Sequence, residues 1–230
     1  MLLQTLLQIP GASPVTTPTT PTTPAESLSL IDLTLAGGPV MIPIGILFIL
    51  VIFLYFERYL TIRKAAKGDP KFMLNIRDYI SGGNLDAAKM LCKNTDTPIA
   101  RMIEKGIMRL GSPLKNIEVA VENVGKLELY KMEKNLAAIA MISGVGPMLG
   151  FLGTVTGMIQ AFYIMSQSDQ ISPKVLSGGI YEAMVTTVAG LIVGIIANVA
   201  YNSLIALVEK MIYKMEATTV KFVDLLQEPA

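Results

Sequence analysis

Three long stretches without a charged side chain constrain the fold of this 230-residue chain more than any other feature. They cover residues 33–56, 135–168 and 183–208, and are 24, 34 and 26 residues long. The apolar core of a bilayer, about 30 Å thick, is crossed by roughly 20 helical residues, so each stretch can form one transmembrane helix. The sequence predicts an all-α membrane protein with three spans, at 37–56, 135–168 and 183–208.

The placement of Lys and Arg predicts the orientation of these spans. Residues 1–56 contain none, residues 57–134 contain 15, the connection 169–182 contains one and residues 209–230 contain three. Short loops on the cytoplasmic side of a membrane are enriched in Lys and Arg. We therefore expect the N-terminus and 169–182 outside, 57–134 to be a cytoplasmic domain and 209–230 to be a cytoplasmic C-terminal helix.

Residues 1–36 are expected to be an extension on the outer side. Residues 14–24 read PVTTPTTPTTP, a low-complexity composition that cannot bury a core and favours a flexible tether, with docking of a partner as the alternative. Residues 27–35, SLSLIDLTL, are apolar enough to lie along the membrane surface as a short helix.

Helix signals fill the segment 57–134. Asn84 and the pair Thr97-Pro98 are typical of helix starts, and Gly111 is typical of a helix end. After Pro113 there is no obvious stop before the second uncharged stretch. We therefore expect long helices that extend into a cytoplasmic helical domain, with the second span continuous from about 113 to 166, roughly 80 Å.

The three predicted spans differ in their side chains. The first is bulky and apolar around most of its circumference, which favours contact with membrane lipids. The other two carry small residues at intervals of three or four, which let helices approach closely. The glycines expected at such a contact are Gly146, Gly150, Gly153 and Gly157 in the second span and Gly190 and Gly194 in the third.

Five polar side chains accompany these glycines. They are Thr154, Thr156, Glu182, Thr186 and Thr187. Threonine hydroxyls in membrane helices often bond to a carbonyl one turn earlier, so each threonine has a purely structural interpretation. Glu182 either marks the outer end of the third helix or faces a polar cavity, because contact with lipid is costly for an ionisable group.

Composition excludes several classes of function. The chain has no His, which removes Ser-His-Asp triads and most zinc chemistry, and its single Cys excludes an internal disulfide. The net charge of +1, with acids interspersed among the bases, gives no reason to expect nucleic-acid binding. We expect no enzyme, cofactor or metal site. The spans contain no Asp, Lys or Arg, so a proton pathway would need a carboxylate from another polypeptide.

Two sequence blocks resemble the TolQ/ExbB/MotA proton-channel family, and most of all its ExbB and TolQ branches. The first is PMLGFLGTVTGMIQAF, residues 147–162, and the second is GGIYEAMVTTVAGLIVGIIANVAYN, residues 178–202. The resemblance covers roughly residues 37–226. It implies a multi-pass protein of the bacterial inner membrane that forms a homopentameric ring, in which the second and third spans line a central pore and residues 1–36 are periplasmic.

The resemblance also implies partners and an activity. Inside the pore it places a single-span protein of the ExbD/TolR type, whose membrane Asp carries the proton, and beyond it a TonB- or TolA-like protein. The complex converts proton motive force into work at the outer membrane. Carried over by motif, Thr154 and Thr187 are pore threonines and Glu182 is the glutamate of the second block.

Two residues depart from the family pattern, and several roles stay open. Thr186 stands where the ExbB branch commonly has Ala, and Thr156 where a bulky residue is usual. Extra hydroxyls raise sodium as an alternative to the proton, since hard cations prefer oxygen ligands. A TolQ-like role in envelope constriction and a gliding or flagellar stator are further alternatives, and a non-conducting membrane scaffold is the alternative from another class.

Overall fold

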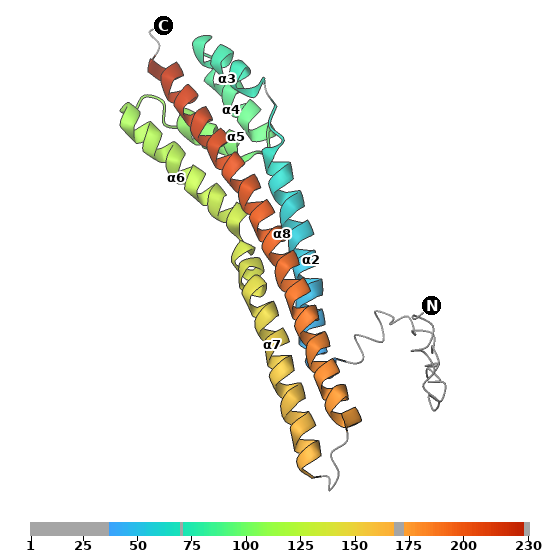
Figure 1. Cartoon of the computed structure of the whole chain (residues 1–230). Helices are drawn as coiled ribbons and strands as arrows, with labels where there is room; N and C mark the ends of the chain where they lie inside the picture. Colours follow the sequence, from blue (N-terminus) through green and yellow to red (C-terminus); the bar gives the residue numbers. More distant parts are fainter. Residues whose placement is uncertain (1–36, 70, 168–172, 228–230) are drawn as a thin grey trace, which may run out of the picture.

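The computed structural model describes residues 37–69, 71–167 and 173–227. The predicted tether at 14–24 and the surface helix at 27–35 lie outside these residues. Within the described part of the chain every regular element is an α-helix. The helices are α2 (Met41–Ala66), α3 (Phe72–Ser81), α4 (Leu85–Asn94), α5 (Pro98–Ile107), α6 (Leu114–Glu133), α7 (Leu136–Ser166) and α8 (Pro173–Gln227) (Figure 1).

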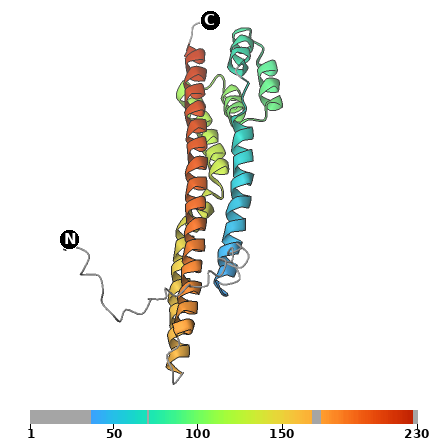
Figure 2. The same cartoon turned by 45° about the vertical axis from the view of Figure 1, so that its right-hand side comes forward.

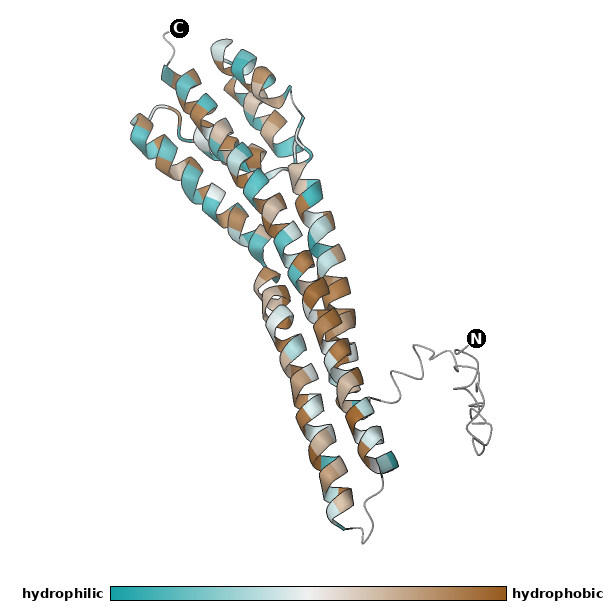
Figure 3. Cartoon of the chain, in the orientation of Figure 1, coloured by the Kyte–Doolittle hydropathy of each residue, from teal (hydrophilic) through white to brown (hydrophobic). Residues whose placement is uncertain are grey.

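Three long helices, α2, α7 and α8, run side by side along the molecule (Figures 1 and 2). By length and composition, three helical stretches could cross a membrane: Met41–Ala66, Leu114–Ser166, which joins α6 and α7, and Leu176–Gln227. Apolar residues dominate α2 and the middle of α8, whereas hydrophilic residues gather toward the end that holds α3 to α6 (Figure 3). The chain therefore has the architecture of an all-α, multi-pass membrane protein, as the sequence predicts.

The first membrane helix presents a bulky apolar surface away from its neighbours. Ile49 and Phe53 of α2 are 69% and 65% exposed, whereas Val51 and Leu54 are buried against the rest of the molecule. Figure 2 shows that α2 stands on one side of the α7–α8 pair and leads into α3. These exposed side chains belong to the face that we expect to contact lipid. The helix runs from Met41 to Ala66, so it starts later and ends later than the span predicted at 37–56.

The head of the molecule comprises α3 to α6 together with α8 after Val208. Two of its short helices, α4 and α5, begin at predicted caps: the Asn84 side chain accepts a hydrogen bond from the Ala87 N–H at 3.1 Å, and Thr97 accepts one from the Ala100 N–H at 3.2 Å. A core that includes Ile76, Ile103, Val121 and Phe222 holds these helices against α8. The head is thus a packed helical domain, as the density of helix signals in 57–134 predicts.

The structure corrects the prediction of one uninterrupted helix from about 113 to 166. Lys134 has extended backbone angles and Asn135 is left-handed, with a φ of 65°, so α6 ends at Glu133 and α7 begins at Leu136. Asparagine tolerates this conformation better than other residues with a side chain, apart from aspartate. The break redirects the chain, and α6 diverges from α8 whereas α7 follows it (Figure 1).

The third span is longer than predicted in both directions. Residues 173–182, expected within the outer connection 169–182, form the first turns of α8, and the expected C-terminal helix at 209–230 is the end of the same helix as far as Gln227. Fifty-five helical residues extend about 80 Å. This single helix therefore connects the membrane part of the molecule to the head.

Candidate functional site at the contact between α7 and α8

Glycine residues bring the backbones of α7 and α8 into direct contact. A Cβ atom on Gly150 would lie 3.0 Å from the carbonyl oxygen of Thr186 and 3.2 Å from the Cα atom of Gly190. On the other helix, a Cβ atom on Gly190 would lie 2.6 Å from the carbonyl oxygen of Gly146. These neighbours are backbone atoms that cannot move aside, so a side chain at either position would push the helices apart.

The remaining glycines named from the sequence lie along the same contact. Gly194 packs on the ring of Pro147, and a Cβ atom there would lie 2.6 Å from its Cγ atom. Gly153 faces the side chain of Thr186, and Gly157 faces Ala183, whose Cβ atom would lie 3.2 Å from an added Cβ. Gly179 also packs on Ala161, so the contact extends over about four turns of each helix, and glycine or alanine occupies most of its central positions.

One threonine joins the two helices by a hydrogen bond. The hydroxyl of Thr187, in α8, donates to the carbonyl oxygen of Gly150, in α7, at 3.1 Å. Because the glycines let the two backbones approach closely, the Thr187 hydroxyl reaches a carbonyl of α7. Thr187 is therefore a residue of the α7–α8 contact itself.

The other three threonines bond within their own helices. Thr186 is buried and donates to the Ala183 carbonyl at 2.8 Å. The half-buried Thr154 donates to the Phe151 carbonyl at 2.6 Å. The exposed Thr156 hydroxyl lies 3.0 Å from the Leu152 carbonyl and 3.1 Å from the Gly153 carbonyl, in the same helix. These bonds match the structural interpretation that applies to any membrane threonine.

Within one chain, the structure does not bring Thr154 and Thr187 to a common cavity. Thr154 lies at a shallow surface depression whose described lining, including Val155, Met158 and Phe162, belongs to α7 alone. Thr187 instead faces α7. A pore between these hydroxyls would thus require further copies of the chain.

Glu182 lies where the segment before α2 meets α8. Its half-buried side chain packs against Gly38, which has a φ of +64° and leaves no room for a side chain of its own. Next to it, a Cβ atom on Gly37 would lie 3.3 Å from the Cγ2 atom of Thr186. Glu182 therefore lies near one end of the glycine contact, next to the residues that precede α2.

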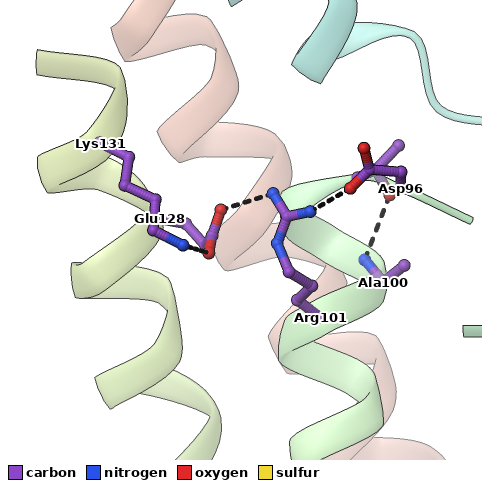
Figure 4. Close-up of polar contacts among 6 residues, drawn as sticks. Asp96, Ala100, Arg101, Glu128 and Lys131 are labelled. Atoms are coloured by element: carbon purple, nitrogen blue, oxygen red, sulfur yellow. Dashed lines mark hydrogen bonds and ion pairs between the residues drawn. The ribbon is translucent and has the colours of Figure 1, made fainter. Parts of the chain in front are cut away.

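A buried polar cluster in the head was not found from the sequence. Glu128 of α6 is 4% exposed and accepts hydrogen bonds from Arg101 of α5 and Lys131 of its own helix, both at 2.6 Å (Figure 4). Arg101 also pairs with Asp96, and the buried Arg58 of α2 donates to the Lys131 carbonyl at 3.3 Å. The cluster ties α2, α5 and α6 together just before the break at Asn135.

The environment of this cluster shifts two pKa values. Burial alone would raise the pKa of Glu128, but the hydrogen bonds and positive charges of Arg101 and Lys131 outweigh burial and hold that pKa below its usual value. The hydrogen bond to Glu128 raises the pKa of the Arg101 guanidinium further. Glu128 is therefore an ionised carboxylate that holds helices together. The sequence shows only that Glu128 and Lys131 have helical spacing.

The chemistry available to the glycine contact is limited. Residues 136–166 and 183–208 contain no Asp, Glu, Lys, Arg or His. The described residues also contain no group of three or more His, Cys, Asp or Glu side chains that could hold a metal ion. The contact offers close backbone packing, hydroxyl groups and one carboxylate at its end.

Comparison with known proteins identifies the family. The model of the MotA/TolQ/ExbB proton channel family matches residues 94–217, which include α5, α6, α7 and most of α8. The biopolymer transport protein ExbB of Neisseria meningitidis serogroup A is 27% identical over 187 residues, which cover 74% of this chain and 84% of that protein.

Two further relatives support the same assignment. A putative ExbB-like protein of a Synechocystis species is 27% identical over 203 residues, 84% of this chain and 97% of its own. The Tol-Pal system protein TolQ of Haemophilus influenzae is 31% identical over 137 residues, 56% of this chain and 55% of its own. With three candidate spans and a glycine contact between the last two, this chain belongs to the MotA/TolQ/ExbB proton channel family, on its ExbB branch.

Proposed function

We propose that this chain is the ring-forming subunit of a proton-driven motor in a bacterial inner membrane. In this proposal the N-terminus is periplasmic and the head is cytoplasmic, as the placement of Lys and Arg suggests. Five copies surround a pore, with α7 and α8 on the inside and the bulky face of α2 toward lipid. The ring of five is what membership of the MotA/TolQ/ExbB proton channel family implies, and the match to that family supports it.

The observation that carries the proposal is the chemistry of the α7–α8 contact. It combines close backbone packing with hydroxyl groups, yet its membrane residues provide no carboxylate that could take up and release a proton along the way. A proton pathway therefore needs a titratable group from outside the chain. A single-span partner of the ExbD/TolR type, with one membrane Asp, supplies that group inside the ring.

The residues of the contact then have distinct roles. Thr187 holds α8 against α7 through Gly150, and a hydroxyl bond of this kind contributes about 0.6 kcal/mol in a membrane. Thr154, half-buried on α7, would exchange its hydrogen bond to the Phe151 carbonyl for one to the partner's carboxylate. Glu182 attracts cations at the outer end of the pathway. Thr156 and Thr186 add further hydroxyl groups near Thr154 and Thr187. Because hard cations prefer oxygen ligands, sodium is the second candidate for the transported ion.

The motor drives a TonB-like protein that energises transport across the outer membrane. A TolQ-like role in envelope constriction and a stator role are alternatives within the same family, and a non-conducting scaffold is the alternative outside it. A scaffold needs the glycine contact but has no use for the hydroxyl of Thr154 or the charge of Glu182. We expect no enzyme, because the sequence contains no His and its predicted spans contain no Asp.

Complementation of energy-dependent uptake tests the proposal. The chain and its single-span partner are expressed in cells that lack their own ExbB and ExbD, and uptake of an iron chelate is measured with and without a protonophore. We expect Thr154→Val and Glu182→Gln to assemble normally but to lose uptake, whereas Phe53→Leu, on the exposed face of α2, retains it. Full uptake by both pathway variants at normal expression would favour the scaffold.

A further inference from the structure

A groove of about 540 Å³ opens in the head between α6 and α8. The two helices diverge beyond the break at Asn135, as Figure 1 shows, and α5 contributes Met102 to the groove between them. The residues of α8 that line it run from Ile212 to Asp224, a length of about 20 Å. The groove therefore has the length of a helix of three to four turns.

The groove is lined by apolar side chains and flanked by acidic ones. Apolar side chains line it from all three helices, among them Met102, Leu129, Ile212, Met215 and Val223. Four exposed carboxylates and a single cation, Lys126, accompany them. The carboxylates are Glu118 and Glu122 of α6 and Glu216 and Asp224 of α8.

These carboxylates are not used inside the chain. Among the described residues, none of the four forms an ion pair, whereas Glu128, on the same helix as two of them, forms two. An apolar floor of about 20 Å with acids on both flanks is the complement of a helix that has one apolar stripe and basic sides. Methionine side chains adapt to different apolar partners, which suits such a groove.

We propose that the groove between α6 and α8 binds a basic amphipathic helix of another polypeptide. The segments of this chain that the structure does not describe have the wrong charge for this role. Residues 1–36 contain no Lys or Arg but two acids, and residues 168–172 and 228–230 each contain one acid and no base. The inference concerns the head alone, so it holds or fails separately from conduction through the membrane part.

The first test uses the full-length protein in detergent micelles and a synthetic peptide. The peptide has about 14 residues, with Leu at helical spacing on one face and Lys on its sides. Because the chain contains no Trp, Val220→Trp places a single indole in the lining of the groove. We expect saturable binding with a blue shift of the indole emission, and no shift with a peptide of the same composition whose scrambled order has no apolar stripe.

Charge variants locate the binding site. Replacing the four groove carboxylates together, as Glu118→Gln, Glu122→Gln, Glu216→Gln and Asp224→Asn, should weaken binding by about tenfold and reduce its dependence on salt. The matched control replaces Glu133 and Glu209 by Gln. These are exposed acids on the same two helices that do not line the groove. The control should bind the peptide as the parent protein does.

Three results would overturn the proposal. Equal binding of the scrambled peptide, or equal weakening by the groove and control variants, would mean that only general electrostatic attraction was measured. Native mass spectrometry of the same variants gives the third: if the groove variant changes the number of subunits and the parent binds no peptide, the occupant is a second copy of this chain.

Discussion

A single buried carboxylate, Glu128, shows how the head uses charge. Its side chain is almost completely removed from solvent but accepts hydrogen bonds from two cations, Arg101 and Lys131. A buried carboxylate would be costly without these partners, although both cations are themselves partly exposed to solvent. Glu128 therefore contributes to the stability of the head only while it is ionised.

The first prediction concerns the pH dependence of that stability. The folded state lowers the pKa of Glu128 from its usual value of 4.5, so the folded protein binds this proton less readily than the unfolded chain. The contribution is complete above about pH 4.5 and is lost as the pH falls through the lower folded value. Thermal unfolding between about pH 3 and pH 6 should show this loss in the parent protein.

Two variants, Glu128→Gln and Glu133→Gln, distinguish the contribution of Glu128 to the melting temperature from that of other carboxylates. Glu128→Gln should lower the melting temperature at about pH 7 and flatten its decline below about pH 4.5, because the variant has no charge to lose at this site. Glu133, on the same helix, is exposed, and Glu133→Gln should follow the parent curve. A Glu128→Gln curve parallel to that of the parent would contradict the role of the ionised carboxylate.

A second prediction concerns Cys92, the only thiol in the chain. Burial, with a smaller effect from the charge of Glu104, raises the pKa of the Cys92 thiol to about 12. The reactive thiolate is then roughly a thousandfold rarer at about pH 8 than for an ordinary cysteine. Labelling with a maleimide should be very slow in the native protein and rapid in denaturant. Rapid labelling of the native protein would show that α4 opens or packs differently.

The capping residues could be predicted from the sequence because their interactions are local. Asn84 and Thr97 each bond to an amide three residues further on, so the pattern of a few neighbouring residues predicts them. Arg101 and Glu128 are 27 residues apart, and only the packing of α5 on α6 brings them together. Their charges are indistinguishable in the sequence from those that orient the chain in the membrane.

At the scale of elements, the break between α6 and α7 is the main departure from the sequence-based prediction. The helix-forming residues on both sides, with no Gly or Pro between Glu133 and Leu136, favour a continuous helix. The available signal is Asn135 itself, since a left-handed residue at the end of a helix is usually Gly and sometimes Asn. That signal is weak alone, because asparagine also occurs inside helices.

The contact between α7 and α8 gives a prediction with a matched control. A Cβ atom on Gly150 would lie 3.0 Å from a backbone oxygen of α8, whereas one on Gly144 of the same helix has no neighbour within 4 Å. Gly150→Ala should therefore cost about 1–3 kcal/mol through overpacking. Gly144→Ala should be neutral or stabilising by up to about 1 kcal/mol, because alanine favours the helix.

The melting temperatures of the two variants in detergent, measured by circular dichroism, test this difference in stability. The predicted order of melting temperatures is Gly144→Ala at or above the parent and Gly150→Ala below it. Equal melting temperatures for the two variants would mean that α7 and α8 do not approach as closely as the structure shows.

At the scale of the whole molecule, the division into apolar long helices and a charged head is the one that the sequence predicts. Within the described residues, most of each uncharged stretch lies in one of the three long helices, because the length of an apolar run alone is enough to predict a span. The described part of the charged segment 57–134 forms most of the head. The glycines of the site were also predictable from their spacing. The position of Thr154 in a surface depression of α7, away from Thr187, was not, since a lone threonine beside the glycines carries no signal of the helix face on which it lies.

Proton flux through proteoliposomes tests the central claim most directly, namely that this chain provides the path and a partner provides the carboxylate. A pH-sensitive dye trapped inside the vesicles reports the decay of an imposed pH gradient. The account predicts that vesicles with this chain alone hold the gradient nearly as long as protein-free vesicles. Vesicles that also contain the single-span partner should lose it quickly, unless the partner's membrane Asp is replaced by Asn. Rapid decay with this chain alone would contradict the account.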